Sequence, residues 1–407
     1  MTTNKLLYFL ASLLIGFSGC TLDSDDDQPV VPTVIVPATY DFLRGTTTSV
    51  AFEGQRTRIF MAQDILDALA DPSTTEEELN NMFRNTEGTD PFPSAELNAS
   101  TKSVRSKVAA SNDLFATNAT NAATFRADFD AYLAGQAREV APNWNELAAP
   151  GQAGQIADGS STRYVNALGL EYNQAFAKGL IGALMYDQAV NNYLSPEVLD
   201  AGTNRTDNDG GILVEGENYT NMEHKWDEAY GYVFGAAADP RNGLADLGEA
   251  DDFLNKYLGR VNDDPDYAGI ATEIEESFRI GRAALSQQDY LRRDQEAARI
   301  RARLSAVLVI RAVYYLAQAQ NHLQATPAAT GSAFHALSEA YGFIYGLRFI
   351  ARNETQLATA TEISEDYLAT LLNADNGGFW TLDPAELGRM AREISARYEI
   401  VYAQAAN

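Results

Sequence analysis

The chain has 407 residues, of which 45% are hydrophobic and 21% are charged, so it can bury a core of ordinary size. Acidic residues outnumber basic ones by 56 to 30, which gives a formal net charge of −26. A field of that sign repels the phosphate backbone and argues against nucleic acid as a partner. A single cysteine excludes an internal disulfide, and any histidine chemistry must use His224, His322 or His335.

Residues 1–19 have the features of a signal peptide. Lys5 precedes an almost wholly apolar run at residues 6–17, which is too short to span a bilayer. Small residues then precede Cys20, a pattern that resembles the lipobox of bacterial lipoproteins, with Phe17 where leucine is usual. The resemblance implies cleavage before Cys20, lipid on its sulfur and a mature chain anchored in the bacterial outer membrane.

Residues 20–39 form the predicted tether between this anchor and the folded part. An acidic run at residues 23–27 and a Pro/Val stretch up to Pro37 predict extended, solvated chain. Two interpretations stay open. The acidic run resembles the surface-export signal of Bacteroidetes lipoproteins, which would place the protein on the cell surface, and it is equally well explained as a simple solvated linker.

The folded part begins with an expected short β element, with residues 49–52 as one strand and residues 33–36 as a second. Apolar spacing then predicts helices throughout: near 59–69 and at 165–194, 220–236, 269–325, 333–353, 355–373 and 384–404. Clusters of Gly, Asp, Asn and Pro separate them, at 204–211, 239–243, 262–266 and 373–378. The expected class is all-α, built as packed antiparallel bundles.

An internal repeat organises the second half of the chain. Residues 224–235 match residues 335–346, with His, Glu, Ala, Tyr and two glycines at the same spacing. Upstream, residues 177–194 match residues 306–323 more loosely. Two matching helix pairs in the same order indicate a duplication. We therefore expect two pseudo-symmetric bundles, formed by residues 40–259 and residues 260–407.

The spacing shared by the two copies of the repeat places the His, the Glu and both glycines of each copy on one stripe of a helix. A glycine inside a helix costs about 1 kcal/mol relative to alanine, so four of them predict close approach by neighbouring helices. The His and Glu then face that neighbour. Buried polar groups of this kind need partners, which can be each other, another polar side chain or a metal ion.

The first copy offers the larger set of metal-ligating side chains. Two carboxylates follow its histidine on the same helix, and a tyrosine and an aspartate on the preceding helix can face it. Imidazole, carboxylate and phenolate oxygen suit a first-row divalent or a ferric ion. The predicted metal site is His224, Asp227, Glu228, Asp187 and Tyr186.

The second copy has fewer carboxylates. Ser338 and Leu316 stand where the first copy has its two aspartates, which leaves Glu339 alone with His335. His335 and Glu339 are therefore second-copy candidates, and the first copy is expected to be the working site. For both copies the alternative is a polar cluster that locks a tight helix crossing. His322 is expected at a helix surface or boundary.

The run around His224 resembles the Gly-x-His-x-x-Glu motif of the imelysin family, bacterial envelope proteins with two pseudo-symmetric helical bundles. Met222 replaces the motif glycine and Asp227 replaces the glutamate, so only His224 and Asp227 correspond to motif positions. Residues 218–232 and 40–58 look like an imelysin-like branch found among Bacteroidetes lipoproteins. The resemblance implies metal binding or iron uptake, and some relatives were named as peptidases.

Sequence motifs of common enzymes are absent. The chain has no His-Glu-x-x-His, no Gly-x-Ser-x-Gly, no P-loop and no Gly-x-Gly-x-x-Gly. The prediction is thus a lipid-anchored envelope protein that binds a metal ion of the iron type. The alternatives are a structural or interaction lipoprotein, in which the His–Glu pairs serve packing, and a metal-dependent peptidase.

Overall fold

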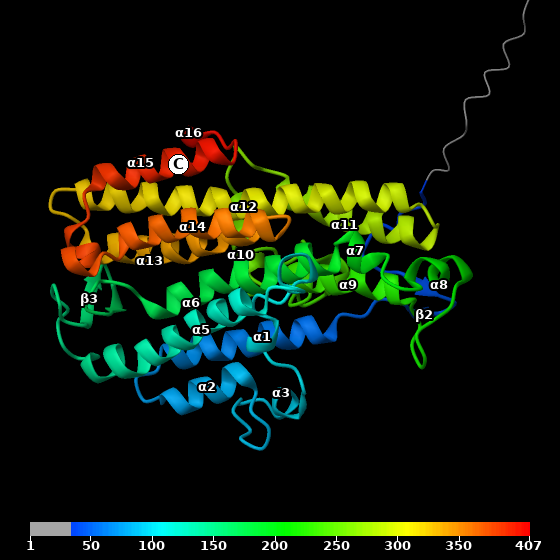
Figure 1. The fold of residues 1–407 in the computed structure, drawn as a ribbon, viewed down its shortest axis with the longest axis horizontal. Coiled ribbons are helices and arrows are strands. Elements are labelled where there is room, and N and C mark those ends of the chain that lie inside the picture. Colours follow the sequence, from blue (N-terminus) through cyan, green and yellow to red (C-terminus); the bar gives the residue numbers. More distant parts are fainter. Residues whose placement is uncertain (1–33) are drawn as a thin grey trace, which may run out of the picture. The chain divides into compact units, whose positions relative to one another are not determined.

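Helices dominate residues 34–407, the part of the chain that the computed structural model describes (Figure 1). Strands form only two small hairpins there, so the predicted all-α class is confirmed. No helix within residues 34–407 combines the length and apolar character needed to cross a membrane. The signal peptide, Cys20 and most of the tether lie outside the described residues.

The helices follow the chain in two groups. The first group is α1 (Glu53–Leu69), α2 (Glu76–Arg84), α3 (Ala95–Ala99), α4 (Asn112–Phe115), α5 (Ala119–Gly135), α6 (Tyr172–Leu180), α7 (Pro196–Leu199), α8 (Asn204–Gly210) and α9 (Asn221–Phe234). The second group is α10 (Leu254–Asn262), α11 (Ile270–Ser286), α12 (Tyr290–Gln324), α13 (Thr330–Gly346), α14 (Glu354–Leu371), α15 (Pro384–Arg397) and α16 (Tyr402–Ala405). Helix α6 continues into two π-helical segments, η4 (Ile181–Tyr186) and η5 (Ala189–Tyr193).

The two hairpins differ from the β element expected from the sequence. Strand β1 (Leu43–Arg44) pairs with β2 (Thr47–Thr48), just before the expected strand at 49–52, which is irregular chain leading into α1. Strands β3 (Gly154–Asp158) and β4 (Ser161–Val165) form a second, unpredicted hairpin. Its turn contains Gly159 at φ 60°, the left-handed conformation that favours glycine in two-residue hairpin loops.

Two helix boundaries were predicted wrongly. The expected helix at 269–325 is interrupted, because Gln288 takes a positive φ of 61° and Asp289 caps α12 by accepting a hydrogen bond from the Arg292 backbone N–H. The expected separator at 204–211 contains α8 instead. Its Asn208 is buried and donates to the Leu285 carbonyl, so contact with α11 outweighs the weak helix propensity of this segment.

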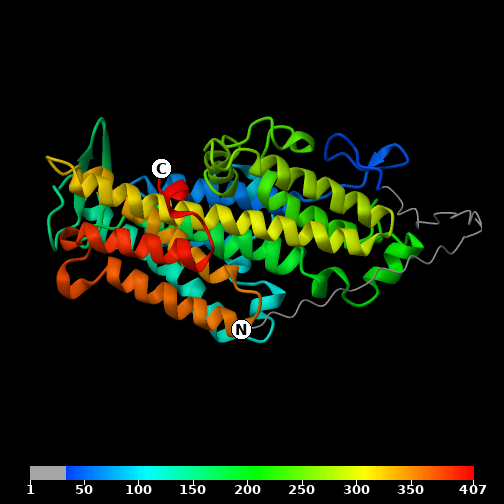
Figure 2. The same cartoon turned by 90° about the horizontal axis from the view of Figure 1, so that it is seen from above.

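The long helix α12 organises the packing, since it lies against α11, α13 and α15 (Figures 1 and 2). Its Leu304, Leu308 and Leu316 are fully buried. Helix α6 packs on α13, and α9 packs on α1, α11 and η5. Residues 34–407 form one compact unit, in which helices of the range 40–259 pack on helices of the range 260–407. The division into two bundles stays a prediction from the repeat.

Candidate functional site

The first copy of the repeat lies on α9. This helix starts at a capping box, in which Thr220 accepts from the Glu223 backbone N–H and the Glu223 carboxylate accepts from the Thr220 backbone N–H. The stripe of α9 that carries His224, Glu228 and Gly231 faces α1, and the repeat glycine predicts such a close helix contact. A β-carbon at Gly231 would lie 2.6 Å from Phe52 Cβ, so only glycine permits this close approach.

The second copy lies on α13 and faces α6. A β-carbon at Gly342 would lie 2.5 Å from Lys178 Cβ and 2.9 Å from the Gly179 backbone nitrogen. Helix α6 therefore stands to α13 as α1 stands to α9. In both copies the repeat glycine lets a helix from elsewhere in the chain approach the stripe that carries the His–Glu pair.

The histidine of the first copy is held by backbone. Nδ1 of His224 lies 3.0 Å from the Ala51 carbonyl oxygen, to which it donates, and the ring stacks on Tyr219 with centroids 4.6 Å apart. Nε2 faces Glu228, 3.8 Å from Oε2. The same oxygen accepts from Lys225 at 2.6 Å, and the other glutamate oxygen accepts from Gln55 at 2.9 Å.

The histidine of the second copy is held by a carboxylate. Nδ1 of His335 donates to Glu171 Oε1 at 2.9 Å, and Nε2 faces Glu339 Oε2 at 3.9 Å. The other oxygen of Glu339 accepts from Tyr257 at 2.6 Å and lies 3.4 Å from Lys178 Nζ. His335 thus stands between two carboxylates, so the expectation that Glu339 alone accompanies it is wrong.

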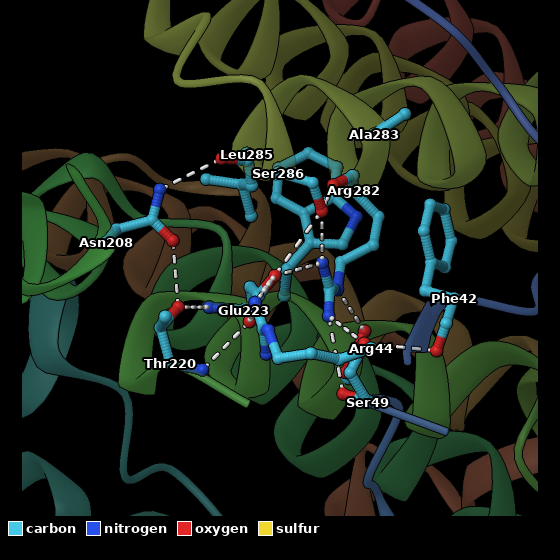
Figure 3. Close-up of polar contacts among 12 residues, drawn as sticks. Phe42, Arg44, Ser49, Asn208, Thr220, Glu223, Arg282, Ala283, Leu285 and Ser286 are labelled. Carbon is cyan, nitrogen blue, oxygen red and sulfur yellow. Dashed lines mark hydrogen bonds and ion pairs between the residues drawn. The ribbon is translucent and has the colours of Figure 1, made fainter. Parts of the chain in front are cut away.

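Two other carboxylates of α9 belong to a buried ion-pair network around Arg282 of α11 (Figure 3). Arg282 is fully buried and donates to Glu223 at 2.8 Å and to Asp227 at 3.0 Å. Asp227 also accepts from the Tyr40 hydroxyl at 2.7 Å, and Arg44 of β1 donates to Glu223. The network therefore joins the first hairpin to α9 and α11.

The predicted five-residue metal site is not assembled as a unit. Asp227 faces Arg282 rather than the imidazole of His224. Asp187 accepts from Ser111, from both its backbone N–H and its hydroxyl, and Tyr186 shares a hydrogen bond with Ser305. Of the five residues, the structure brings only His224 and Glu228 within 4 Å of each other through their side chains.

The choice of Tyr186 followed from a repeat alignment that stacking in the structure does not support. Tyr315 stacks on Phe343, with centroids 5.8 Å apart. The first-copy counterpart of Phe343 is Tyr232, which stacks on Tyr193 at 6.2 Å. Tyr193 is therefore the spatial counterpart of Tyr315, two helical turns beyond Tyr186. The segment that joins the two tyrosines is π-helical in η4 and η5.

The charges of the site residues follow from burial and neighbours. Burial lowers the pKa of His224, because it disfavours the charged ring more than Glu228 favours it. Burial raises the pKa of Asp227 to about 7, although Arg282 acts in the opposite direction. For Glu339 the balance is reversed: burial raises its pKa, but Lys178 and His335 together lower it to about 2.

A metal ion could find two protein ligands at either copy. Nε2 of each histidine and the nearby glutamate lie on the same side, whereas Nδ1 is on the opposite edge of the ring. Glu171 therefore cannot share an ion with Glu339. Within residues 34–407 no group of three His, Cys, Asp or Glu side chains converges as a metal site would require. Each His–Glu pair can at most begin a coordination sphere that water or an external ligand would complete.

Three participants were missed by sequence reasoning: Glu171, Arg282 and Lys178. They lie 164, 55 and 161 positions from their partners in the chain, so each reaches its partner from a different helix. Glu171 directly precedes α6 and Lys178 lies in its last turn, and the signal that could have found them was their charge. His322 is half-buried near the end of α12, as expected.

Fold and site define an all-α protein in which each copy of a repeated helix carries one His–Glu pair. The chain belongs to the family described as Domain of unknown function (DUF4856), whose model matches residues 37–401. Neither the curated proteins nor the solved structures contain a match to the chain. The family match carries no link to imelysin or to Bacteroidetes lipoproteins, so that resemblance stays a prediction.

Proposed function

We propose that this protein is a non-enzymatic, lipid-anchored binding protein of the bacterial outer membrane that takes a metal ion at its His–Glu pairs. The lipid anchor is proposed from the signal peptide and Cys20, and the resemblance to imelysin-like envelope proteins supports the metal. Membrane attachment through the anchor makes the protein a surface or periplasmic receptor for its ligand.

One observation carries the metal proposal. In both copies Nδ1 donates to a fixed oxygen, from the Ala51 carbonyl or the Glu171 carboxylate, so Nε2 is the nitrogen that carries the lone pair when the ring is neutral. Metal-ligating histidines are oriented by such hydrogen bonds. That lone pair lies beside the Glu228 or Glu339 carboxylate, in side chains about a quarter exposed for both histidines. The pair is thus accessible and suits a first-row divalent or ferric ion.

The experiment uses the mature chain carrying Cys20→Ser, from which bound metal is removed with a chelator and by dialysis. The chain is then titrated with Zn²⁺, Fe²⁺ and Cu²⁺ in a calorimeter. We expect two ions per chain, and His224→Ala and His335→Ala should each remove one. His322→Ala is the matched control and should remove none. Affinity should fall as the pH drops through the range in which histidine protonates, because the ligand nitrogen must be unprotonated.

A second candidate function is favoured by the ion pairs themselves. Lys225 already binds Glu228 at 2.6 Å, and Arg282 occupies Asp227, so the pairs can serve as packing devices of an interaction lipoprotein. If wild type binds no metal, or if both histidine variants bind as wild type does, this second function is the better one. A peptidase would need a general base and a third ligand, for which residues 34–407 offer no cluster.

A further inference from the structure

Lysine is the scarcest charged residue of the chain, and its positions are not scattered. Of the six lysines, five belong to residues 34–407, and all five lie at the two copies of the repeat. In the second copy, Lys178 lies beside Glu339 and Lys256 beside Asp252, so each has a carboxylate partner. The first-copy group is Lys102, Lys107 and Lys225.

Lys107 lacks such a partner. It is half-buried, with Nζ 5.7 Å from the centre of the Tyr193 ring. Within residues 34–407 its ammonium has neither a carboxylate at ion-pair distance nor a hydrogen-bond acceptor. Burial lowers the pKa of Lys107, the nearby Arg58 and Lys225 lower it further, and only Glu228 opposes them. An ammonium in this setting needs an anion to compensate its charge.

Two more cations lie at the start of α1. Arg58 is 6% exposed and donates to the carbonyls of Ser103 and Gly54, at 3.1 and 3.0 Å, but it pairs with no carboxylate in the described part of the chain. A β-carbon at Gly54 would lie 3.2 Å from Lys102 Cε and 3.5 Å from Arg58 Nη1. Lys102 and Arg58 therefore lie together on this side of the first-copy pair.

Glu228 is the carboxylate that lies nearest to Lys107 and Lys225. Its two oxygens are occupied by Lys225 and Gln55, and the Lys225 ammonium lies 5.5 Å from the centre of the same Tyr193 ring as Lys107. Arg58, Lys102 and Lys225 all lie near Lys107, and of these four cations only Lys225 contacts Glu228, in a chain whose formal net charge is −26. The local charge around Lys107 is therefore positive, whereas the net charge of the whole chain is negative.

A buried hydroxyl supplies an independent sign of a missing ligand. Tyr232 of α9 is fully buried, and its hydroxyl has no hydrogen-bond partner among the residues described. Burial raises the pKa of Tyr232 to about 12, the Arg58 guanidinium beside the hydroxyl lowers it, and Glu228 and Asp187 raise it, so the ring lies close to Arg58 and to two carboxylates. A buried donor without a partner is rare, because it costs about 1–3 kcal/mol.

We propose that Arg58, Lys102, Lys107 and Lys225 form a binding site for a small oxyanion, a molecule that carries a carboxylate or a phosphate group. The anion supplies the negative charge that Lys107 and Arg58 lack and an acceptor for the Tyr232 hydroxyl. This site goes beyond the proposed metal function, since its ligand has the opposite charge and does not use Nε2 of His224.

The test uses inorganic phosphate and succinate as probes, titrated separately into the mature chain carrying Cys20→Ser after chelation and dialysis. Wild type is expected to bind at least one probe. Lys107→Met should weaken that binding by about tenfold or more, as loss of a charge-assisted contact does. Lys256→Met, whose ammonium is already paired with Asp252, is the matched control and should bind as wild type does. Binding of phosphate but not succinate would identify a phosphate group as the ligand, and the reverse result would identify a carboxylate.

Two further measurements separate this site from folding and from the metal. Lys107→Met should unfold at the same or a higher denaturant concentration than wild type, because it removes an uncompensated cation. Glu228→Gln should bind the anion more tightly and a metal ion more weakly, so the two proposals can fail independently. The anion site is overturned if wild type binds neither probe, or if Lys107→Met binds as wild type does.

Discussion

The two copies of the repeat share a stripe but differ in what their helices meet. On α9 the residues Glu223 and Asp227 face Arg282, whereas the corresponding residues on α13 are Phe334 and Ser338. Phe334 packs against Phe379 and Trp380, so no buried cation is required there. The extra carboxylates of the first copy are therefore explained by a salt bridge and not by a larger metal site.

The second copy shows the complementary arrangement. Its glutamate is nearly buried and is held by Lys178 and the Tyr257 hydroxyl, and its histidine receives a carboxylate from the start of α6. The comparison teaches that the number of carboxylates along one helix does not predict which of two sites is better able to bind a metal ion. Which copy is better equipped depends on the charges that other helices bring to it.

The largest expected effect tests the Arg282 network. Arg282→Met leaves Glu223 and Asp227 buried without their shared cation, which should lower the free energy of unfolding by about 3–5 kcal/mol. The second-copy counterpart, Lys178→Met, strands one carboxylate that keeps a hydroxyl donor, so its cost should be smaller, about 1–3 kcal/mol. Urea unfolding measures both. Equal losses would mean that the two copies depend on buried cations to the same extent.

An intermediate effect tests the helix approach on α13. Gly342→Ala places a methyl group 2.5–3.1 Å from atoms of Lys178 and Gly179, mostly backbone, and should cost about 1–3 kcal/mol. Gly346→Ala on the same helix meets ordinary contacts at 3.4 Å and beyond, so it should be close to neutral. Thermal unfolding of the two variants checks this. A neutral Gly342→Ala would contradict a helix crossing that depends on this glycine.

The smallest expected effect is a pH dependence that should differ between the copies. The folded-state pKa of Glu339 is about 2, below its ordinary value of 4.5, so its ionised form stabilises the fold above pH 4.5 and this contribution is lost as the pH falls towards 2. The stability difference between wild type and Glu339→Gln should therefore shrink by about 1–2 kcal/mol between about pH 6 and about pH 3. For Glu228, whose pKa is also lowered but whose side chain is more exposed, the change should be smaller. Urea titrations from about pH 6 to about pH 3 test it, and an unchanged Glu339→Gln difference would refute it.

A large part of the helical fold could be predicted from local pattern. Helical spacing located α6 with its continuation, α9, α13, α14 and α15 to within several residues of their bounds. The second hairpin was missed although residues 158–160 carry an Asp-Gly-Ser turn signal between strand-like residues. The loose upstream match of the repeat led to the wrong tyrosine, because few shared residues fix its register, and the segment concerned is π-helical in η4 and η5.

The sequence by itself determined what depends on neighbours a few positions apart. Helices follow from apolar spacing, a His and a Glu four residues apart must lie on one face, and repeat glycines mark close helix contacts. Tertiary structure alone decided which charges meet these groups. Asp227 and Arg282 are 55 positions apart, and His335 and Glu171 are 164 positions apart. Pairing across such distances depends on how helices pack, and packing is set by the whole buried surface rather than by any one motif.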